Sequence, residues 1–211
     1  MSKRTHTDAS PAPDTRQHIL LVSLTLFLQK NFKEVTMKEI VTATGMSKGA
    51  VYHHFDSKES LFREIIGHFF SAILSFDFTR LPGDSLRSFY RAIATDLNAM
   101  RFQFLSGTGT QTDFITLNFF SLLFDAFKLF PEFRTDMETY HLRELEAWTG
   151  IIAKARAAGE IRTPLDDKQV ARIFLYASDG LTMNLTMDSN TGDLESELLS
   201  LWDHFYETLK A

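Results

Sequence analysis

The sequence predicts an all-α protein, with an N-terminal unit of short helices followed by a larger helical region. Two observations support this. Nearly every segment after residue 15 spaces its apolar residues with a helical period, and no segment alternates apolar and polar residues as a half-buried strand would. The expected helices are also separated by residues that begin or end helices, among them Gly45, Pro131 and Gly159.

The first thirty residues divide into a tail and a helix. Residues 1–15 are polar and are expected to form a flexible tail. Residues 16–30 are expected to form a helix, with Ile19, Leu20 and Phe27 on one apolar stripe.

Capping signals place the next three helices. Thr36 and Glu39 match a capping box, so a helix should cover residues 36–44 and stop at the following glycine. A short helix is expected at 47–54, beginning at a serine, and the motif D-S-K-E begins a longer helix over 56–75.

The remainder of the chain predicts five more helices, near residues 84–102, 113–130, 131–158, 166–187 and 193–210. The stretch S-G-T-G-T-Q-T-D at 106–113 is expected to be a loop. The segment 113–130 is apolar on most faces, which predicts a buried helix.

Composition excludes several classes of protein. The hydrophobic fraction of 44% and charged fraction of 23% are typical of a soluble globular protein. The absence of cysteine excludes a disulfide framework and a thiolate metal site. No apolar run reaches about 18 residues, and the N-terminus lacks the apolar core of a signal peptide, so we expect a cytoplasmic protein without a membrane span.

The net charge of −5 is unevenly distributed. Residues 1–60 hold eight Lys or Arg and six Asp or Glu, a net charge of +2, whereas residues 61–211 carry −7. This asymmetry favours an N-terminal unit that meets an anion, although chance scatter of surface charge explains it about as well.

The stretch G-M-S-K-G-A-V-Y-H-H-F at 45–55 is small at its start and aromatic at its end. Together with the preceding helices it forms a helix-turn-helix, in which the second helix of the pair enters the DNA major groove. Ser47, Gly49 and Ala50 are small, so the backbone and the base edges can come close, and Lys48 can reach a guanine edge or a phosphate.

The later residues of this helix divide between two faces. Val51 and Phe55 lie four apart and should face the core of the unit. Tyr52 and His53 should lie on the outer side, where a phenol or an imidazole can bind a phosphate.

This N-terminal region resembles the tetracycline-repressor (TetR) family of one-component transcriptional regulators. The family's hallmark Y-x-x-F-x-S-K-E-x-L begins here at Tyr52, and the resemblance covers about residues 19–62. Asn31, Val41 and Thr44 depart from the usual pattern, but none lies on the proposed DNA face. The resemblance implies a helix-turn-helix DNA-binding domain over 16–62 and an effector-binding and dimerisation domain over 63–211.

The resemblance also implies which residues contact DNA. Thr36, Tyr52 and Lys58 hold phosphates in this family pattern, and Lys48 with its neighbours reads bases. Lys58 lies in the first turn of a helix, an unfavourable place for a cation, which suggests an outside anion. The full predicted DNA-binding set is Thr36, Ser47, Lys48, Gly49, Ala50, Tyr52, His53 and Lys58.

In this family the last two helices pair with their copies to form a dimer, and an effector cavity lies between the middle helices. The predicted dimer interface comprises Val170, Phe174, Ala177, Leu181, Leu198, Leu201, Trp202 and Phe205. The predicted pocket comprises Phe102, Phe104, Phe114, Phe119, Phe120, Phe124, Tyr140, His141, Trp148, Tyr176 and Met183. Such rings could take a flat apolar molecule, including a cationic one, although any single ring is more often part of the core.

Other functional classes have little support. The adjacent His53 and His54 point about 100° apart on a helix and do not share an ion easily. No zincin motif, phosphate loop or catalytic triad can be inferred, so we predict no enzyme, no metal site and no cofactor.

The sequence therefore predicts a ligand-responsive dimeric regulator, most simply a repressor, that binds a near-palindromic DNA operator and is released by a small apolar or aromatic effector. The alternative is a helical small-molecule or partner-binding module with weak or lost DNA binding. Substituting Tyr52 and Lys58 by alanine should separate the two, because a DNA binder should lose affinity with little change in fold.

Overall fold

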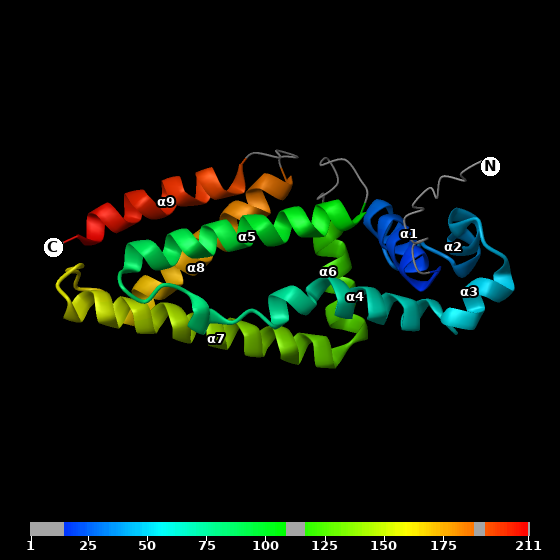
Figure 1. Ribbon diagram of the computed structural model, residues 1–211, viewed down its shortest axis with the longest axis horizontal. Helices are drawn as coiled ribbons and strands as arrows, with labels where there is room; N and C mark the ends of the chain where they lie inside the picture. The colour runs from blue at the N-terminus through cyan, green and yellow to red at the C-terminus, as the bar shows by residue number, and fades with distance from the viewer. Residues whose placement is uncertain (1–14, 109–116, 188–192, 211) are drawn as a thin grey trace, which may run out of the picture.

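The computed structural model describes residues 15–108, 117–187 and 193–210, so most of the expected N-terminal tail and residue 114 of the expected pocket lie outside it. Within these ranges the chain forms nine α-helices and one short 3-10 helix. The molecule is elongated, with α1 to α3 gathered at one end and the long helices of the C-terminal region lying side by side toward the other (Figure 1).

The N-terminal helices are α1 (Thr15–Gln29), α2 (Met37–Thr44), α3 (Lys48–His54) and α4 (Lys58–Leu74). Their order and approximate bounds confirm the sequence prediction. The helix α4 leads from the N-terminal group into the long C-terminal region (Figure 1) and passes residue 62, where the sequence predicted a domain boundary.

The short helices begin and end at the predicted capping residues. The Thr36 hydroxyl accepts a hydrogen bond from the Glu39 amide at 3.2 Å, and the Glu39 carboxylate accepts one from the Thr36 amide at 2.9 Å. Gly45 ends α2 with φ of 67°, a left-handed conformation that favours glycine. Ser47 begins α3, because its hydroxyl accepts the Ala50 amide at 3.2 Å.

The C-terminal region contains a 3-10 helix η1 (Phe78–Arg80) and the helices α5 (Leu86–Thr108), α6 (Leu117–Leu129), α7 (Pro131–Ala157), α8 (Asp167–Met187) and α9 (Leu194–Leu209). The prediction of a loop beginning at residue 106 was wrong for 106–108, which continue α5. The sequence also gave no sign of η1, which begins where the Asp77 carboxylate accepts the Thr79 amide.

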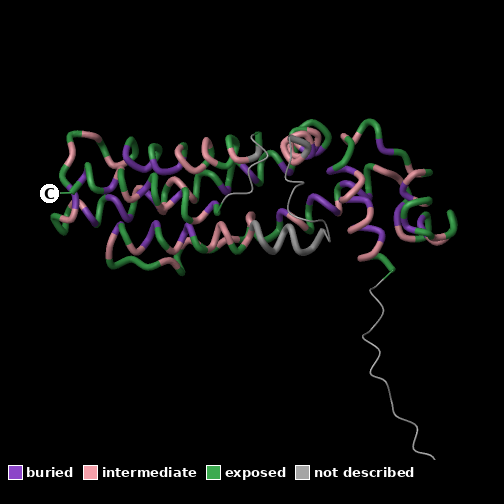
Figure 2. The backbone as a smooth tube through the Cα atoms, turned by 90° about the horizontal axis from the view of Figure 1, so that it is seen from above, coloured by how far each residue is buried: buried purple, intermediate pink, exposed green. Residues whose placement is uncertain are grey.

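The buried residues form two separate clusters along the long axis. The first joins the inner faces of α1 to α4 with residues of α6 and the first half of α7, including Phe62 and Phe130. The second lies among α5, the second half of α7, α8 and α9, and is centred on Trp148, Phe174 and Trp202. Buried positions recur along the inner side of the long helices in Figure 2.

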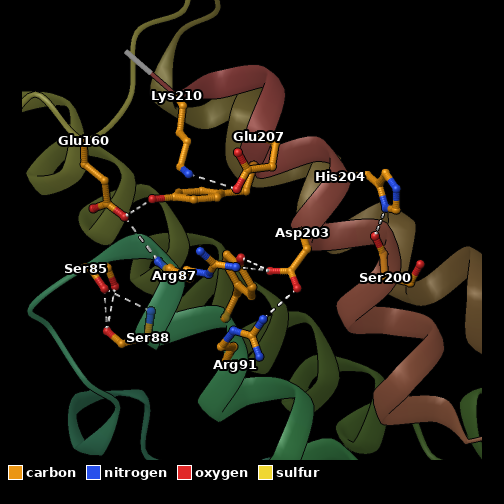
Figure 3. Close-up of polar contacts among 12 residues, drawn as sticks. Ser85, Arg87, Ser88, Arg91, Glu160, Ser200, Asp203, His204, Glu207 and Lys210 are labelled. Carbon is orange, nitrogen blue, oxygen red and sulfur yellow. Dashed lines mark hydrogen bonds and ion pairs between the residues drawn. The ribbon is translucent and has the colours of Figure 1, made fainter.

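A polar network fixes the far end of the second cluster (Figure 3). The Glu160 carboxylate accepts the Leu86 amide at 3.0 Å and the Tyr206 hydroxyl at 2.9 Å, which joins the start of α5 to α9. Asp203 accepts hydrogen bonds from the Tyr90 hydroxyl and from Arg91, the latter at 2.7 Å. These bonds hold α9 on α5 at this end of the C-terminal region.

Candidate nucleic-acid interface

The helix α3 has an inner face that holds it to the chain and an outer face that is open. Val51 is 0% exposed and Phe55 is 3% exposed, so both anchor α3 in the first core cluster. Ser47, Lys48, Gly49 and His53 are exposed, and Tyr52 is 38% exposed. Ala50 is half-buried. The structure thus separates the faces as the sequence predicted.

Gly49 is not required by the chain's own packing. A Cβ atom added there would meet only the Ser47 hydroxyl oxygen, at 4.0 Å, and the backbone φ of Gly49 is not positive. Glycine inside a helix costs about 1 kcal/mol relative to alanine. Because the fold gives no reason for this cost, the small residue points to close approach by a surface outside the chain.

Two polar side chains lie along the outer face of α3. The Lys48 ammonium lies 5.4 Å from the centre of the Tyr52 ring, in a cation–π contact one helical turn apart. No acidic side chain in the described ranges forms an ion pair with Lys48 within 4.0 Å. The contact holds both groups on the outer side, where a positive charge and a phenol hydroxyl are available to a phosphate or a base edge.

Thr36 lies at the start of α2, and it is also exposed. Its hydroxyl donates to the Glu39 carboxylate at 3.0 Å, which in turn binds the Lys30 ammonium at 2.7 Å. The Lys30 hydrogen bond, followed by the bonds from Thr36, lowers the pKa of Glu39 to about 2. Glu39 therefore stays ionised at neutral pH and fixes the orientation of Thr36.

The position of Lys58 has an explanation within the chain. Its ammonium donates to the main-chain carbonyls of Phe32 at 2.8 Å and Val35 at 2.7 Å, and it lies 4.3 Å from the centre of the Phe32 ring. The inference that a cation in the first turn of a helix implies an outside anion therefore does not hold here. Lys58 anchors the turn between α1 and α2, and one of its three ammonium protons remains for a phosphate.

That same turn also contacts the C-terminal region. The Phe32 amide donates to the Asp125 carboxylate of α6 at 3.3 Å. Arg63 of α4 forms an ion pair with Glu132 of α7. Sequence reasoning missed these contacts, although a lone carboxylate in the apolar helix α6 was a signal that could have drawn attention to Asp125.

The predicted pocket residues do not share one site. Trp148 is 0% exposed in the second core cluster, whereas Tyr140 is buried at the edge of the first. Tyr176, Met183 and Phe124 are exposed at 65%, 47% and 52%, so the structure does not place them in a buried pocket. His141 is also exposed, and Phe119 and Phe120 are half-buried. Phe114 and the side chains of Phe102 and Phe104 lie outside the described residues.

The residues of the predicted dimer interface are also divided between the core and the surface. Val170, Phe174, Leu198 and Trp202 are each at most 1% exposed because they fill the chain's own second core cluster, so they cannot meet a partner. Ala177, Leu181 and Phe205 pack partly against that cluster, and Leu201 is 46% exposed. A different stripe is open on α8, with Ile173, Tyr176, Met183 and Met187 at helical spacing.

Two other kinds of site are absent from the described ranges. Residues 15–108, 117–187 and 193–210 bring together no group of three or more His, Asp or Glu side chains that could hold a metal ion. None of the helices found there has both the length and the apolar character needed to cross a bilayer.

Comparisons with known proteins agree with this geometry. Residues 19–65 match the model of the bacterial regulatory proteins of the tetR family. The chain is 43% identical over 65 residues to the HTH-type transcriptional regulator AcrR of Shigella flexneri, and 40% identical over 65 residues to the HTH-type transcriptional repressor KstR2 of Rhodococcus jostii (strain RHA1). These matches cover 31% and 28% of this chain, and only 29% and 32% of the relatives.

A solved structure extends the likeness to the whole fold. NalD, the secondary repressor of the MexAB-OprM multidrug efflux pump in Pseudomonas aeruginosa, superposes with a TM-score of 0.60 at 20% identity. The superposition covers 93% of this chain and 95% of NalD. The family model falls on the helices that carry the candidate interface, so this N-terminal region is similar to the corresponding region of the tetR family of bacterial regulatory proteins.

Proposed function

We propose that this protein is a cytoplasmic, ligand-responsive transcriptional repressor that binds a near-palindromic DNA operator as a homodimer. The observation that carries the proposal is the outer face of α3, where Gly49 leaves open space and Lys48 and Tyr52 face outward. A short helix with such a face fits the major groove of DNA, where Lys48 can reach guanine O6 or N7.

Operator binding by two recognition helices needs a dimer, because half-sites lie roughly 34 Å apart along the duplex. The open stripe of α8, from Ile173 to Met187, supplies an apolar face for that dimer. Gly180 lies on the same stripe with nothing within 4 Å of an added Cβ, so a partner helix can approach closely there. Exposed Leu201 of α9 adds to this apolar surface.

An effector in the C-terminal region would act by favouring one of two arrangements of the recognition helices. The hydrogen bond from Phe32 to Asp125 gives α6 a direct contact with the turn before α2. A movement of α6 would therefore reach the DNA face through this contact, and it would not have to be transmitted along the full length of α4. The ion pair between Arg63 and Glu132 adds a second contact between the two regions.

The test is selection of bound duplexes from a random DNA library by the purified protein at a stated moderate salt concentration. Enrichment of an inverted repeat is expected. The Lys48→Ala variant should weaken binding to the selected repeat by about 10-fold, which corresponds to about 1.4 kcal/mol. Lys168→Ala, at an exposed position of α8, is the matched control and should bind normally.

Binding that depends on salt but not on sequence, or an absence of binding with and without added small molecules, would count against the proposal. Those outcomes would favour a helical module whose DNA-binding function is weak or lost.

A further inference from the structure

The helix α3 depends on its neighbours for its position. It has seven residues, and an isolated helix of that length is unstable in water. Val51 and Phe55 attach its inner face to the first core cluster. The direction in which α3 leaves α2 is set by the turn before it, at Gly45 and Met46, and by the contacts of the residue that ends it.

The turn before α3 is bound by a side chain of α1. The Val41 carbonyl near the end of α2 accepts the Thr44 hydroxyl at 3.0 Å, and the Thr42 carbonyl accepts the Gly45 amide at 3.2 Å, so both are satisfied locally. The Thr44 carbonyl instead lies 3.2 Å from Nε2 of His18, in the first turn of α1. A carbonyl oxygen only accepts, so His18 Nε2 donates this bond. His18 thus satisfies the last carbonyl of α2, directly before the left-handed Gly45.

The residue that ends α3 contacts the same turn of α1. Phe55 is the C-cap of α3 and is 3% exposed. The Arg16 guanidinium lies 5.3 Å from the centre of the Phe55 ring, and both of its terminal nitrogens contact the Glu64 carboxylate of α4. This two-point contact fixes the plane of the guanidinium beside the ring. From one turn of α1, which lies with α2 and α3 at one end of the molecule (Figure 1), Arg16 and His18 therefore reach both ends of α3.

We propose that His18 and Arg16 are positioning residues for DNA recognition, which hold the two ends of α3 so that its outer face meets the bases. Base edges are read through hydrogen bonds, which weaken steeply when their geometry changes, whereas phosphate contacts supply binding that does not depend on sequence. Loss of either contact should therefore lower the preference for the operator more than the affinity for DNA in general. The inference rests on the proposed function for this effect on DNA binding, but the hold on α3 is a property of the free protein.

The first measurement is hydrogen–deuterium exchange of the full-length protein without DNA. His18→Leu removes the donor, so the amides of α3 should exchange about 5-fold faster, the effect of losing one hydrogen bond. His18→Gln keeps an N–H donor and should restore wild-type exchange. His204→Leu is the control, because a ring nitrogen of His204 also contacts a carbonyl, that of Ser200, within α9. Unchanged exchange of α3 in His18→Leu, or an increase that extends equally to α8 and α9, would overturn the proposal.

Arg16→Met tests the other end of α3. The substitution keeps a long side chain and removes the charge, so the amides at the end of α3, including that of Phe55, should exchange several-fold faster. Arg87→Met is the matched control, because Arg87 likewise lies 5.8 Å from a ring centre, that of Tyr206, and forms an ion pair with Asp203. It should leave the exchange of α3 unchanged. Wild-type exchange of Phe55 in Arg16→Met would remove Arg16 from the positioning role.

Binding to two duplexes separates positioning from direct contact with DNA. By fluorescence anisotropy, His18→Leu should weaken binding to the selected repeat about 5-fold, and binding to a scrambled duplex of the same length by less than about 2-fold. His18→Gln should recover the wild-type ratio of the two affinities. A residue that contacts phosphate itself would weaken binding to both duplexes alike. An equal loss on the two duplexes would therefore contradict a positioning role.

The two measurements distinguish this inference from the proposed function. If the wild type selects no repeat, the proposed function fails, and amide exchange still decides whether His18 and Arg16 hold α3. If the wild type binds an inverted repeat and His18→Leu binds it with the same affinity, the regulator is retained and the positioning role is contradicted.

Discussion

Lys58 binds Phe32 in two ways at once: its ammonium donates to the Phe32 carbonyl at 2.8 Å and lies 4.3 Å from the centre of the Phe32 ring. The Phe32 amide is bound in turn by Asp125 of α6. Phe32, in the turn between α1 and α2, is therefore held from both sides, by Lys58 of α4 and by Asp125 of α6.

We expect Lys58→Ala to destabilise the protein as well as to weaken DNA binding. The substitution leaves the carbonyls of Phe32 and Val35 without charge-assisted partners, at a cost of about 1–3 kcal/mol in the free energy of unfolding. Denaturant unfolding measures that cost. Tyr52→Ala, on the open face of α3, is the comparison and should weaken DNA binding without a comparable loss of stability. Equal stability of the two variants would contradict the anchoring role.

Gly49→Ala should move stability and DNA affinity in opposite directions. The added methyl group meets only the Ser47 oxygen at 4.0 Å, so the helix should gain about 0.5–1 kcal/mol. The same methyl group occupies space on the face proposed to approach DNA, and operator binding should weaken several-fold. Thermal unfolding and fluorescence anisotropy with the selected repeat measure the two effects. If Gly49→Ala is more stable but binds the operator with unchanged affinity, Gly49 is not part of the DNA interface.

The elements of the N-terminal domain could be predicted from sequence because their signals are local. Thr36 with Glu39, Gly45 and Ser47 each set a helix end through contacts within three or four residues, and the structure places all of these ends as expected. The two faces of α3 follow from the same short spacing, which separates Val51 from Tyr52.

The roles of C-terminal side chains depend on contacts that are distant in sequence. Helix α8 has apolar residues on two faces, and sequence spacing cannot say which face the chain covers itself. The buried face proved to be that of Val170 and Phe174, and the open one that of Ile173 and Tyr176. The contacts of Lys58 could not be predicted from local spacing for the same reason, because its partner Phe32 lies 26 residues away in the sequence, at a turn.

Glu39 makes the stability of the N-terminal domain depend on pH in the acid range. Its pKa falls from an unfolded value near 4.5 to about 2 in the folded chain, first through the Lys30 hydrogen bond. The folded state therefore binds fewer protons between these values, so this contribution is present above pH 4.5 and is lost as the pH falls toward 2. Glu39→Gln should lower the unfolding temperature at pH 6 and make less difference near pH 2. A difference that does not change with pH would contradict this origin.

The open stripe of α8 should control the oligomeric state. Tyr176→Glu combined with Met183→Glu places two charges on a face that we propose to be buried between protomers, where an unpaired charge is costly. Light scattering after size exclusion should show a shift from dimer to monomer, with at least a 10-fold loss of operator affinity. Leu142→Glu changes an equally exposed apolar residue on α7 and should leave the dimer intact. If the double variant is still a dimer, the dimer interface lies elsewhere.

Glu144 predicts a pH dependence of the opposite sign, and this dependence can be tested without any ligand. Its folded pKa of about 7 lies above the unfolded value of 4.5, so the folded state binds more protons between these values. The free energy of unfolding should therefore fall as the pH rises from about 4.5 to 7, by roughly 2 kcal/mol from this residue after allowance for its partial exposure.

Glu144→Gln removes the charge whose burial is unfavourable, so it should be the more stable protein at pH 8. At pH 5, where Glu144 is protonated, the two proteins should differ little. Urea unfolding at both pH values, with Glu146→Gln as the control, measures the difference. If Glu144→Gln is no more stable at pH 8 than at pH 5 relative to the wild type, burial does not disfavour the charged form of Glu144.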